Sequence, residues 1–209
     1  MNLHNKEKDY YEYLAKLLLE RFLPDQYVNL KHADKPDLLM GDYHGIEVTR
    51  AILPGEGQAS GIIKQLKTKR SKEDLSKSIK TKEGIEYSLL VSDEHIYSYY
   101  RETATWVSNQ ELKTSFLKKI KKASNYEGIQ TVDLFIFSPM PDWCEKDRVL
   151  DFMKWADKSN NNHYSSIIVY EEKYIYVYNI NNKQFRIVPT DESIVDDCCV
   201  KAKEYALNR

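Results

Sequence analysis

The stretch KPDLLMGDYHGIEVTRA, residues 35–51, places two acids inside apolar sequence. Asp37 follows Pro36 at the start of one short apolar run, and Glu47 lies in the middle of the next. An isolated carboxylate on a half-buried strand has lost hydration, so it usually has a cation, a hydrogen-bond donor or a metal ion nearby. The alternatives are a turn aspartate after proline for Asp37 and an outward-facing edge-strand residue for Glu47. Two such acids on adjacent segments indicate a site.

Alternating side chains predict that the residues around these acids form strands. A meander of three short strands is expected, over residues 27–33, 37–40 and 45–52, with the turn GDYHG joining the last two as a hairpin. Successive side chains in a strand point to opposite faces. Ile46 and Val48 should therefore face one way, while Glu47 and Thr49 share the other face.

The rest of the chain alternates helical and extended patterns. Apolar residues at helical spacing predict an amphipathic helix over residues 5–22, which ends before Pro24. Further helices are expected at 110–124, at 146–157 and after the acidic start 190–197, and further strands at 131–139, 165–171, 174–180 and 184–188. Segment 53–109 interrupts this order, so we interpret it as an insertion within one domain spanning residues 1–209. The order predicts helices packed around a mixed sheet.

These residues and their order resemble the PD-(D/E)xK nuclease superfamily. In that family a helix precedes a strand meander, a Pro-Asp begins one strand, an acid-x-Lys lies on the next, and a helix leads to a central strand. Pro36 and Asp37 match the first motif, and Glu47-Val48-Thr49 stands at the second. The resemblance covers the N-terminal half and residues 110–138. It implies an α/β, restriction-endonuclease-like fold with the insertion after the third strand.

One position departs from the family pattern, because Thr49 stands where the family lysine belongs. Arg50 is no simple replacement, since strand alternation turns it to the opposite face. By resemblance, the lysine would come from the later helix, as Lys119 or Lys122. Residues 122–126, Lys-Ala-Ser-Asn-Tyr, are also similar to a Gln-x-x-x-Tyr helix motif of some members.

The first helix offers the further acid that many members of the family supply. Glu12 and Glu20 are both candidates, and the resemblance of the segment YYEYLAK favours Glu12. An ordinary solvent-facing role is the alternative for each glutamate.

The two central acids suit a hard divalent cation. Mg²⁺, or Mn²⁺ in its place, takes carboxylate oxygens, keeps several waters and is commonly completed by substrate phosphate. Asp37, Glu47 and the Val48 carbonyl are the expected metal ligands, and the ion would lower the pKa of a bound water. A lysine near that water would stabilise the anionic transition state. The expected activity is phosphodiester hydrolysis, with DNA as the expected nucleic acid and RNA left open.

Two other functions stay open beside the enzymatic one. Thr49 is compatible with a nuclease-fold protein that binds nucleic acid without cutting it. A protein-interaction module that uses the acidic C-terminal face is the other alternative. Residues 61–82 carry seven lysines and one arginine against two acids, which suits a polyanion, although a solvated helix or mobile arm is the preferred explanation for such a run without aromatic residues.

Several classes of protein are disfavoured by the sequence. No apolar run approaches the roughly 20 residues needed to cross a bilayer, and the N-terminus lacks the apolar centre of a secretory signal, so a cytoplasmic location is expected. The three cysteines form no CxxC pair and are expected to be reduced. The five histidines lack zinc-ligand spacing, although His44 beside the hairpin turn could approach the acids. Residues 55–64 lack the spacing of a phosphate-binding loop.

Overall fold

The computed structural model describes residues 3–52, 78–80, 86–92, 95–101, 109–122, 126, 128–138, 146–161 and 163–208. The chain divides into two compact units, one formed by Met1–Ala51 with Ser108–Arg209 and the other by Ile52–Val107. Each unit has its own sheet. Within the described part of the chain, no helix has the length and apolar character needed to span a membrane.

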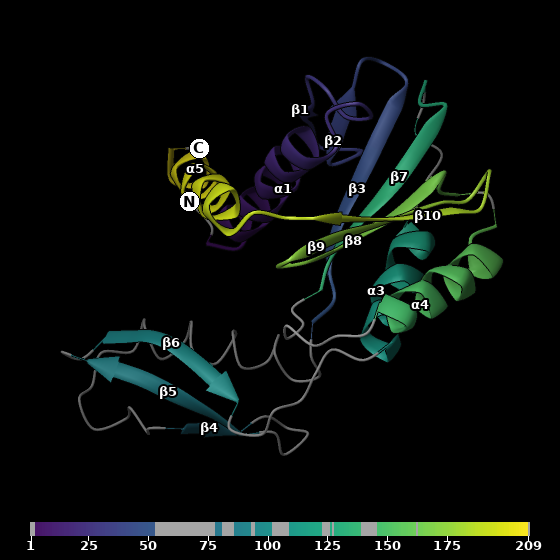
Figure 1. The fold of residues 1–209 in the computed structure, drawn as a ribbon. Coiled ribbons are helices and arrows are strands. Elements are labelled where there is room, and N and C mark those ends of the chain that lie inside the picture. The colour runs from purple at the N-terminus through teal and green to yellow at the C-terminus, as the bar shows by residue number, and fades with distance from the viewer. Residues whose placement is uncertain are drawn as a thin grey trace. The chain divides into compact units, whose positions relative to one another are not determined.

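The larger unit is an α/β structure with a seven-stranded mixed sheet (Figure 1). The strand order is β1-β2-β3-β7-β8-β9-β10, and the bounds are β1 Lys31–His32, β2 Leu38–Met40, β3 His44–Arg50, β7 Thr131–Phe137, β8 Ser166–Glu171, β9 Tyr174–Asn179 and β10 Gln184–Pro189. The pairs β3–β7 and β7–β8 are parallel, and the other pairs are antiparallel. The predicted mixed sheet and its initial antiparallel meander are confirmed.

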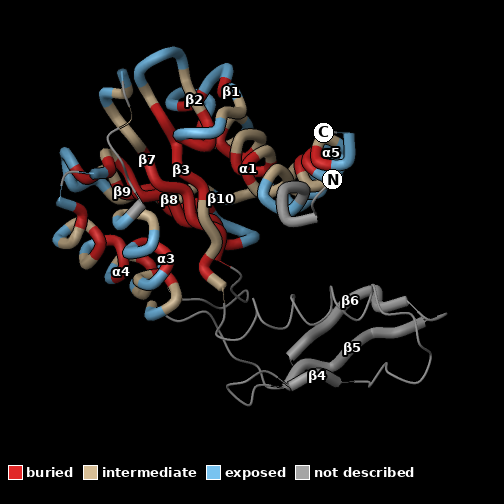
Figure 2. The backbone as a smooth tube through the Cα atoms, turned by 180° about the vertical axis from the view of Figure 1, so that it is seen from behind, coloured by how far each residue is buried: buried red, intermediate tan, exposed pale blue. Residues whose placement is uncertain are grey.

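Four helices of this unit flank the sheet, two on each face (Figure 1). They are α1 Leu3–Phe22, α3 Asn109–Lys122, α4 Lys146–Ser159 and α5 Glu192–Asn208. Helices α1 and α5 pack against one face, and α3 and α4 cover the other, so buried residues run through the centre of the sheet (Figure 2). The four predicted helices are present, with ends that differ from the expected ones by a few residues.

The two faces of β3 carry different chemistry. Ile46 and Val48 lie in the core cluster that includes Leu14 and Leu18 of α1. Glu47 points to the other face, where it meets α3. The predicted alternation is therefore confirmed. It explains how one strand supplies both a core surface and a buried acid.

The predicted first strand over residues 27–33 is wrong for most of its length. Only Lys31 and His32 pair with β2. The amide of Tyr27 donates to the carbonyl of Leu23 at 2.9 Å, so Tyr27 belongs to the turn that follows α1. Asn29 follows with a positive φ of 52°, which a strand cannot accommodate.

The smaller unit contains a three-stranded antiparallel sheet in the order β4-β5-β6. Its strands are β4 Ser78–Lys80, β5 Glu86–Ser92 and β6 His95–Arg101. The strand-like segment YSLLVS lies within β5. The loop at 55–64, Cys144 and the basic segment 61–82, apart from residues 78–80, lie outside the described residues. Cys198 and Cys199 are free thiols, as expected.

A buried acid at the end of β8 makes stability depend on pH. Glu171 is 5% exposed, and Arg148 of α4 lies 3.3 Å from its Oε1. Burial raises the pKa of Glu171 to about 7, although the Arg148 guanidinium opposes the shift. A folded-state pKa above the ordinary value of 4.5 means that the folded protein holds this proton more tightly. The contribution of Glu171 to the free energy of unfolding should therefore fall as pH rises from about 4.5 through about 7.

Glu171→Gln should remove this loss. We expect the stability of the variant, relative to wild type, to increase between pH 5 and pH 8 by about 1 to 3 kcal/mol in urea denaturation. Glu172→Gln, at the exposed neighbouring position, is the matched control and should follow wild type at every pH. Parallel pH profiles for Glu171→Gln and wild type would contradict the assignment.

Candidate active site

Asp37 and Glu47 lie together at the start of the β2–β3 hairpin. Leu38 pairs with Ile46, so the residue that precedes β2 stands opposite Glu47 on β3. Asp37 is 4% exposed and Glu47 is 7% exposed. The Val48 amide donates to Oδ2 of Asp37 at 2.8 Å, which fixes the aspartate against β3.

Gly45 allows this close approach of the two segments. A Cβ atom built at position 45 would lie 2.4 Å from Cγ of Pro36. Real Cβ atoms do not approach carbon so closely, so the ring of Pro36 packs on β3 only because the strand has a glycine there. The Pro36 ring then places Asp37 directly beside the strand.

Lys119 of α3 joins the two acids. Its Nζ lies 2.9 Å from Oδ2 of Asp37 and also donates to Oε2 of Glu47. The helix is held near β3 by Ser115, whose hydroxyl donates to the Arg50 carbonyl at 2.8 Å. Lys119 follows Ser115 by one helical turn, about 6 Å along the axis, and so reaches the acids. Of the two lysines that the sequence offered, the structure places Lys119 on both carboxylates.

Tyr126 completes the contacts of Glu47. Its hydroxyl donates to Oε1 of Glu47, while Lys119 binds Oε2. Tyr126 is the tyrosine of the segment 122–126 singled out in the sequence. Lys122 is the last residue of α3, and its side chain lies outside the described part of the structure.

The electrostatics of the site favour charged groups. Burial alone would raise the pKa of Asp37, but the Lys119 charge and the Val48 amide outweigh it and hold that pKa below its ordinary value. Burial would lower the pKa of Lys119, yet Asp37 and Glu47 together raise it. At neutral pH the site therefore contains an aspartate anion and a lysine ammonium.

Glu12 approaches the site from α1. It is 3% exposed, and Lys8 Nζ lies 3.1 Å from its Oε1 and 3.6 Å from Oδ1 of Asp37. Burial raises the pKa of Glu12; a hydrogen bond with His32 opposes that shift, and the charge of Asp37 adds to it. Glu20, the other acid considered, instead accepts the Leu30 amide at 2.7 Å and has a structural role.

Glu12 is joined by two further residues, which the sequence analysis did not single out as site residues. Asp9 of α1 and His32 of β1 each bring a ligand atom to within 4.8 Å of the others. Asp9 could have been found from the sequence, because it lies three residues before Glu12 and residues at this spacing share one face of a helix. No local pattern pointed to His32, which reaches the group only through the fold.

The other polar residues of β3 and its turn lie elsewhere. Thr49 shares the face of Glu47, whereas Arg50 turns to the α1 side. There its guanidinium lies 4.2 Å from the centre of the Tyr11 ring. His44 does not contact Asp37 or Glu47 in the described contacts; its Nε2 lies 2.7 Å from Oδ2 of Asp133. The Tyr27 hydroxyl donates to the same Asp133 oxygen at 2.7 Å.

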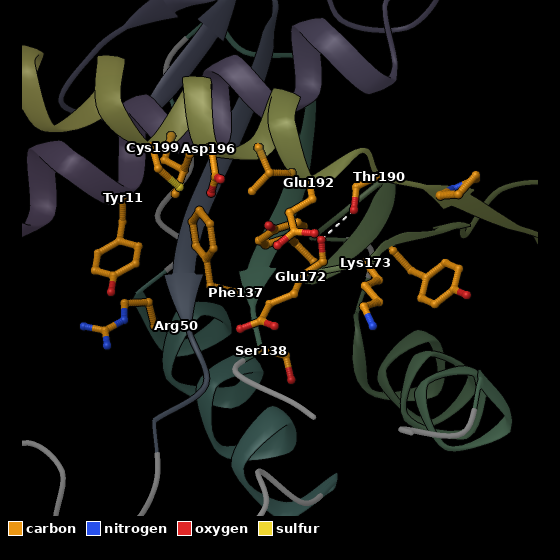
Figure 3. A pocket seen from close by; sticks show the side chains of 15 residues that line it. Tyr11, Arg50, Phe137, Ser138, Glu172, Lys173, Thr190, Glu192, Asp196 and Cys199 are labelled. Atoms are coloured by element: carbon orange, nitrogen blue, oxygen red, sulfur yellow. Dashed lines mark hydrogen bonds between the residues drawn. The ribbon is translucent and has the colours of Figure 1, made fainter. Parts of the chain in front are cut away.

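A separate cavity of about 840 Å³ lies at the C-terminal ends of β3 and β7. Figure 3 shows Arg50, Phe137 and Ser138 at one side of it and residues of α5 at the other. Its wall includes Tyr11 and Cys199. Among the described residues, Glu12, Asp37, Glu47 and Lys119 do not line this cavity, so the polar cluster and the cavity are distinct features.

The donor set of the cluster fits a hard divalent cation. Asp37 and Glu47 both direct an oxygen at one ammonium group, so the same point would be favourable for a metal ion. Carboxylate oxygens are the ligands that Mg²⁺ prefers. Comparisons with protein-family models, curated proteins and solved structures find no match to this chain.

Proposed function

We propose that the protein is a metal-dependent, nuclease-like phosphodiesterase that acts on DNA. The observation that supports this proposal is the meeting of Lys119 with both Asp37 and Glu47. In metal-assisted phosphodiester hydrolysis a divalent cation held by carboxylates activates water and neutralises charge, and a nearby ammonium can stabilise the anionic transition state. The lysine of this set comes from a helix in place of Thr49.

Each side chain then has a definite task. Asp37 and Glu47 would hold Mg²⁺ or Mn²⁺, with the Val48 carbonyl as the third protein ligand. When bound, the ion activates water and neutralises charge on the phosphate. Lys119, as an ammonium, would stabilise the negative charge that develops on the phosphate. Tyr126 fixes the orientation of Glu47 through Oε1.

Exposed lysines of α3 suit a polyanionic substrate. Lys118 and Lys121 are exposed on α3, next to Lys119 in the sequence. Lysines at such positions contact phosphates and contribute affinity without reading sequence. Binding of DNA should therefore weaken with salt.

Metal titration tests the proposal. Calorimetry with Mg²⁺ and with Mn²⁺ should detect binding to the wild type that Asp37→Ala abolishes, since the variant lacks one of two central carboxylates. Asp42→Ala, which removes an exposed acid in the adjoining turn, should bind as wild type does. Cleavage of double- and single-stranded DNA should need the metal and should stop in Asp37→Ala. Absent binding in wild type and Asp37→Ala alike would contradict the proposal.

One observation favours the non-cutting alternative. Lys119 pairs with both acids, so the cluster also has a structural explanation as a buried ion-pair network. Under this alternative the protein binds nucleic acid with salt-dependent affinity and cuts none in Mg²⁺ or Mn²⁺. Metal-dependent cleavage by the wild type would eliminate it.

A further inference from the structure

We propose that Asp9, Glu12 and His32 form a second metal centre, which binds a transition-metal ion and is separate from Asp37 and Glu47. The three residues offer two carboxylate oxygens and one imidazole nitrogen that converge within 4.8 Å. This centre does not depend on the proposed nuclease activity. It would exist equally in a protein that cuts no DNA.

The fold brings the three ligands together from two elements. Asp9 and Glu12 are three residues apart on α1 and so share one face of the helix. His32 enters from β1, and its Nε2 lies 2.5 Å from Oε2 of Glu12 and 3.9 Å from Oδ1 of Asp9. Ligand atoms around a metal with bonds of about 2.1 Å stand about 3 to 3.5 Å apart. On metal binding, the distance from Nε2 to Oε2 of Glu12 must lengthen and the distance from Nε2 to Oδ1 of Asp9 must shorten, each by about half an ångström. Side-chain rotation can supply both changes.

The ligand types select the metal. Imidazole nitrogen suits Zn²⁺, Fe²⁺, Ni²⁺ and Cu²⁺, while Mg²⁺ and Mn²⁺ favour oxygen ligands. Two carboxylates would balance the charge of a divalent ion. The chemistry of this group therefore differs from that of the Asp37–Glu47 pair, which has no nitrogen ligand.

A third element, helix α5, orients the histidine. The Tyr205 hydroxyl of α5 lies 3.4 Å from Nδ1 of His32, on the side of the ring away from Glu12. Tyr205 is itself stacked on Tyr13 of α1, with ring centres 3.9 Å apart. An Nδ1–H donated to this hydroxyl leaves the lone pair on Nε2, which is the atom that faces the two carboxylates. Metal-binding histidines commonly have such an outer partner.

The centre is sheltered, and it shares Lys8 with the first cluster. The side chains of Glu12 and His32 are 4% and 8% exposed, and that of Asp9 is 15% exposed, which leaves a path for an ion. Glu12 directs Oε2 at His32 and Oε1 at Lys8. Lys8 also reaches Asp37, and Glu12 itself interacts with Asp37, so the two sets of acids are neighbours. One oxygen of Glu12 therefore remains for a metal while the other stays with Lys8.

The competing explanation of the cluster is an ion pair of His32 with the carboxylates of Asp9 and Glu12. Metal titration distinguishes this ion pair from a metal centre. Addition of Co²⁺ to the full-length protein should produce visible d–d absorption bands that saturate at one equivalent, and Zn²⁺ should remove them. His32→Ala and Asp9→Ala should each weaken Co²⁺ binding at least tenfold. Tyr205→Phe should weaken it by about tenfold, because it removes the outer partner of the ligand.

Two controls keep this result distinct from the nuclease proposal. Asp37→Ala should keep the Co²⁺ bands, with affinity within about threefold of wild type, even though it removes the first cluster. His163→Ala, which removes an exposed histidine, should have no effect. Thermal denaturation of each variant establishes that it is folded, and Asp9→Ala serves if His32→Ala unfolds.

The Co²⁺ titrations either support or overturn the second centre. Loss of Co²⁺ binding in the Asp9 and His32 variants, with retention in Asp37→Ala, would support the second centre. No Co²⁺ binding by wild type, unchanged binding without His32, or equal loss in His32→Ala and Asp37→Ala would overturn it. Loss in Asp37→Ala alone would overturn it while supporting the Asp37–Glu47 metal site.

Discussion

Lys119→Met should lower metal-dependent DNA cleavage by about 10²- to 10³-fold. The methionine keeps the length and apolar stem of lysine, but it removes the ammonium that stabilises negative charge beside Asp37 and Glu47. Loss of one preorganised charge-stabilising group typically has an effect of this size on kcat. Initial cleavage rates at saturating Mg²⁺ measure it. Lys154→Met is the matched control, since that lysine is exposed on α4, and its rate should stay within a fewfold of wild type.

The same variant should lose stability in a way that metal reverses. Removal of Lys119 leaves two buried carboxylates facing each other, and loss of one partner from a buried ion pair typically costs about 3 to 5 kcal/mol. Urea denaturation at neutral pH without metal should show this loss. Millimolar Mg²⁺ should restore much of it, because an ion bound only to the folded state stabilises that state. A destabilised Lys119→Met protein that Mg²⁺ leaves unchanged would contradict a metal site between these acids.

A lysine moved to β3 should restore the activity that Lys119→Met loses. Thr49 shares the face of Glu47 and lies two residues, roughly 7 Å, further along the strand. An extended lysine side chain from that position spans this distance and can replace the amine of the helix. The double variant Thr49→Lys/Lys119→Met should therefore cleave DNA at least tenfold faster than Lys119→Met alone, under the same metal conditions.

Position-specific controls make this rescue interpretable. Arg50 turns toward Tyr11 and α1, so Arg50→Lys combined with Lys119→Met should rescue nothing. Thr49→Lys in the wild-type background places two amines near the acids and should not exceed wild-type activity. A double variant as slow as Lys119→Met would refute the equivalence of the strand and helix lysines.

Much of the sheet could be predicted because its signals are local. Alternation over β3 assigned Ile46 and Val48 to the core face and Glu47 to the other, and the structure has this arrangement. The strand expected at 27–33 failed, because a composition suited to strands cannot reveal that Tyr27 still bonds to the turn after α1. Its side chain instead reaches Asp133, 106 residues away in the sequence.

Only part of the site could be predicted from the sequence. Asp37 and Glu47 could be paired because a hairpin joins them, whereas the choice between Lys119 and Lys122 depended on the rotation of α3 against β3. Ser115 sets that rotation through its bond to the Arg50 carbonyl, a contact without any sequence signature. His32 was missed for the same reason, since its partners come from both terminal helices.

A crystal of the protein soaked in Mn²⁺ tests the central claim most directly. Anomalous scattering locates the ion without reference to activity. We expect a peak bonded to carboxylate oxygens of both Asp37 and Glu47, with the Lys119 amine displaced from the point between them and still close to the ion's water. An empty site under saturating Mn²⁺, with Lys119 still bound to both acids, would contradict the metal-dependent account.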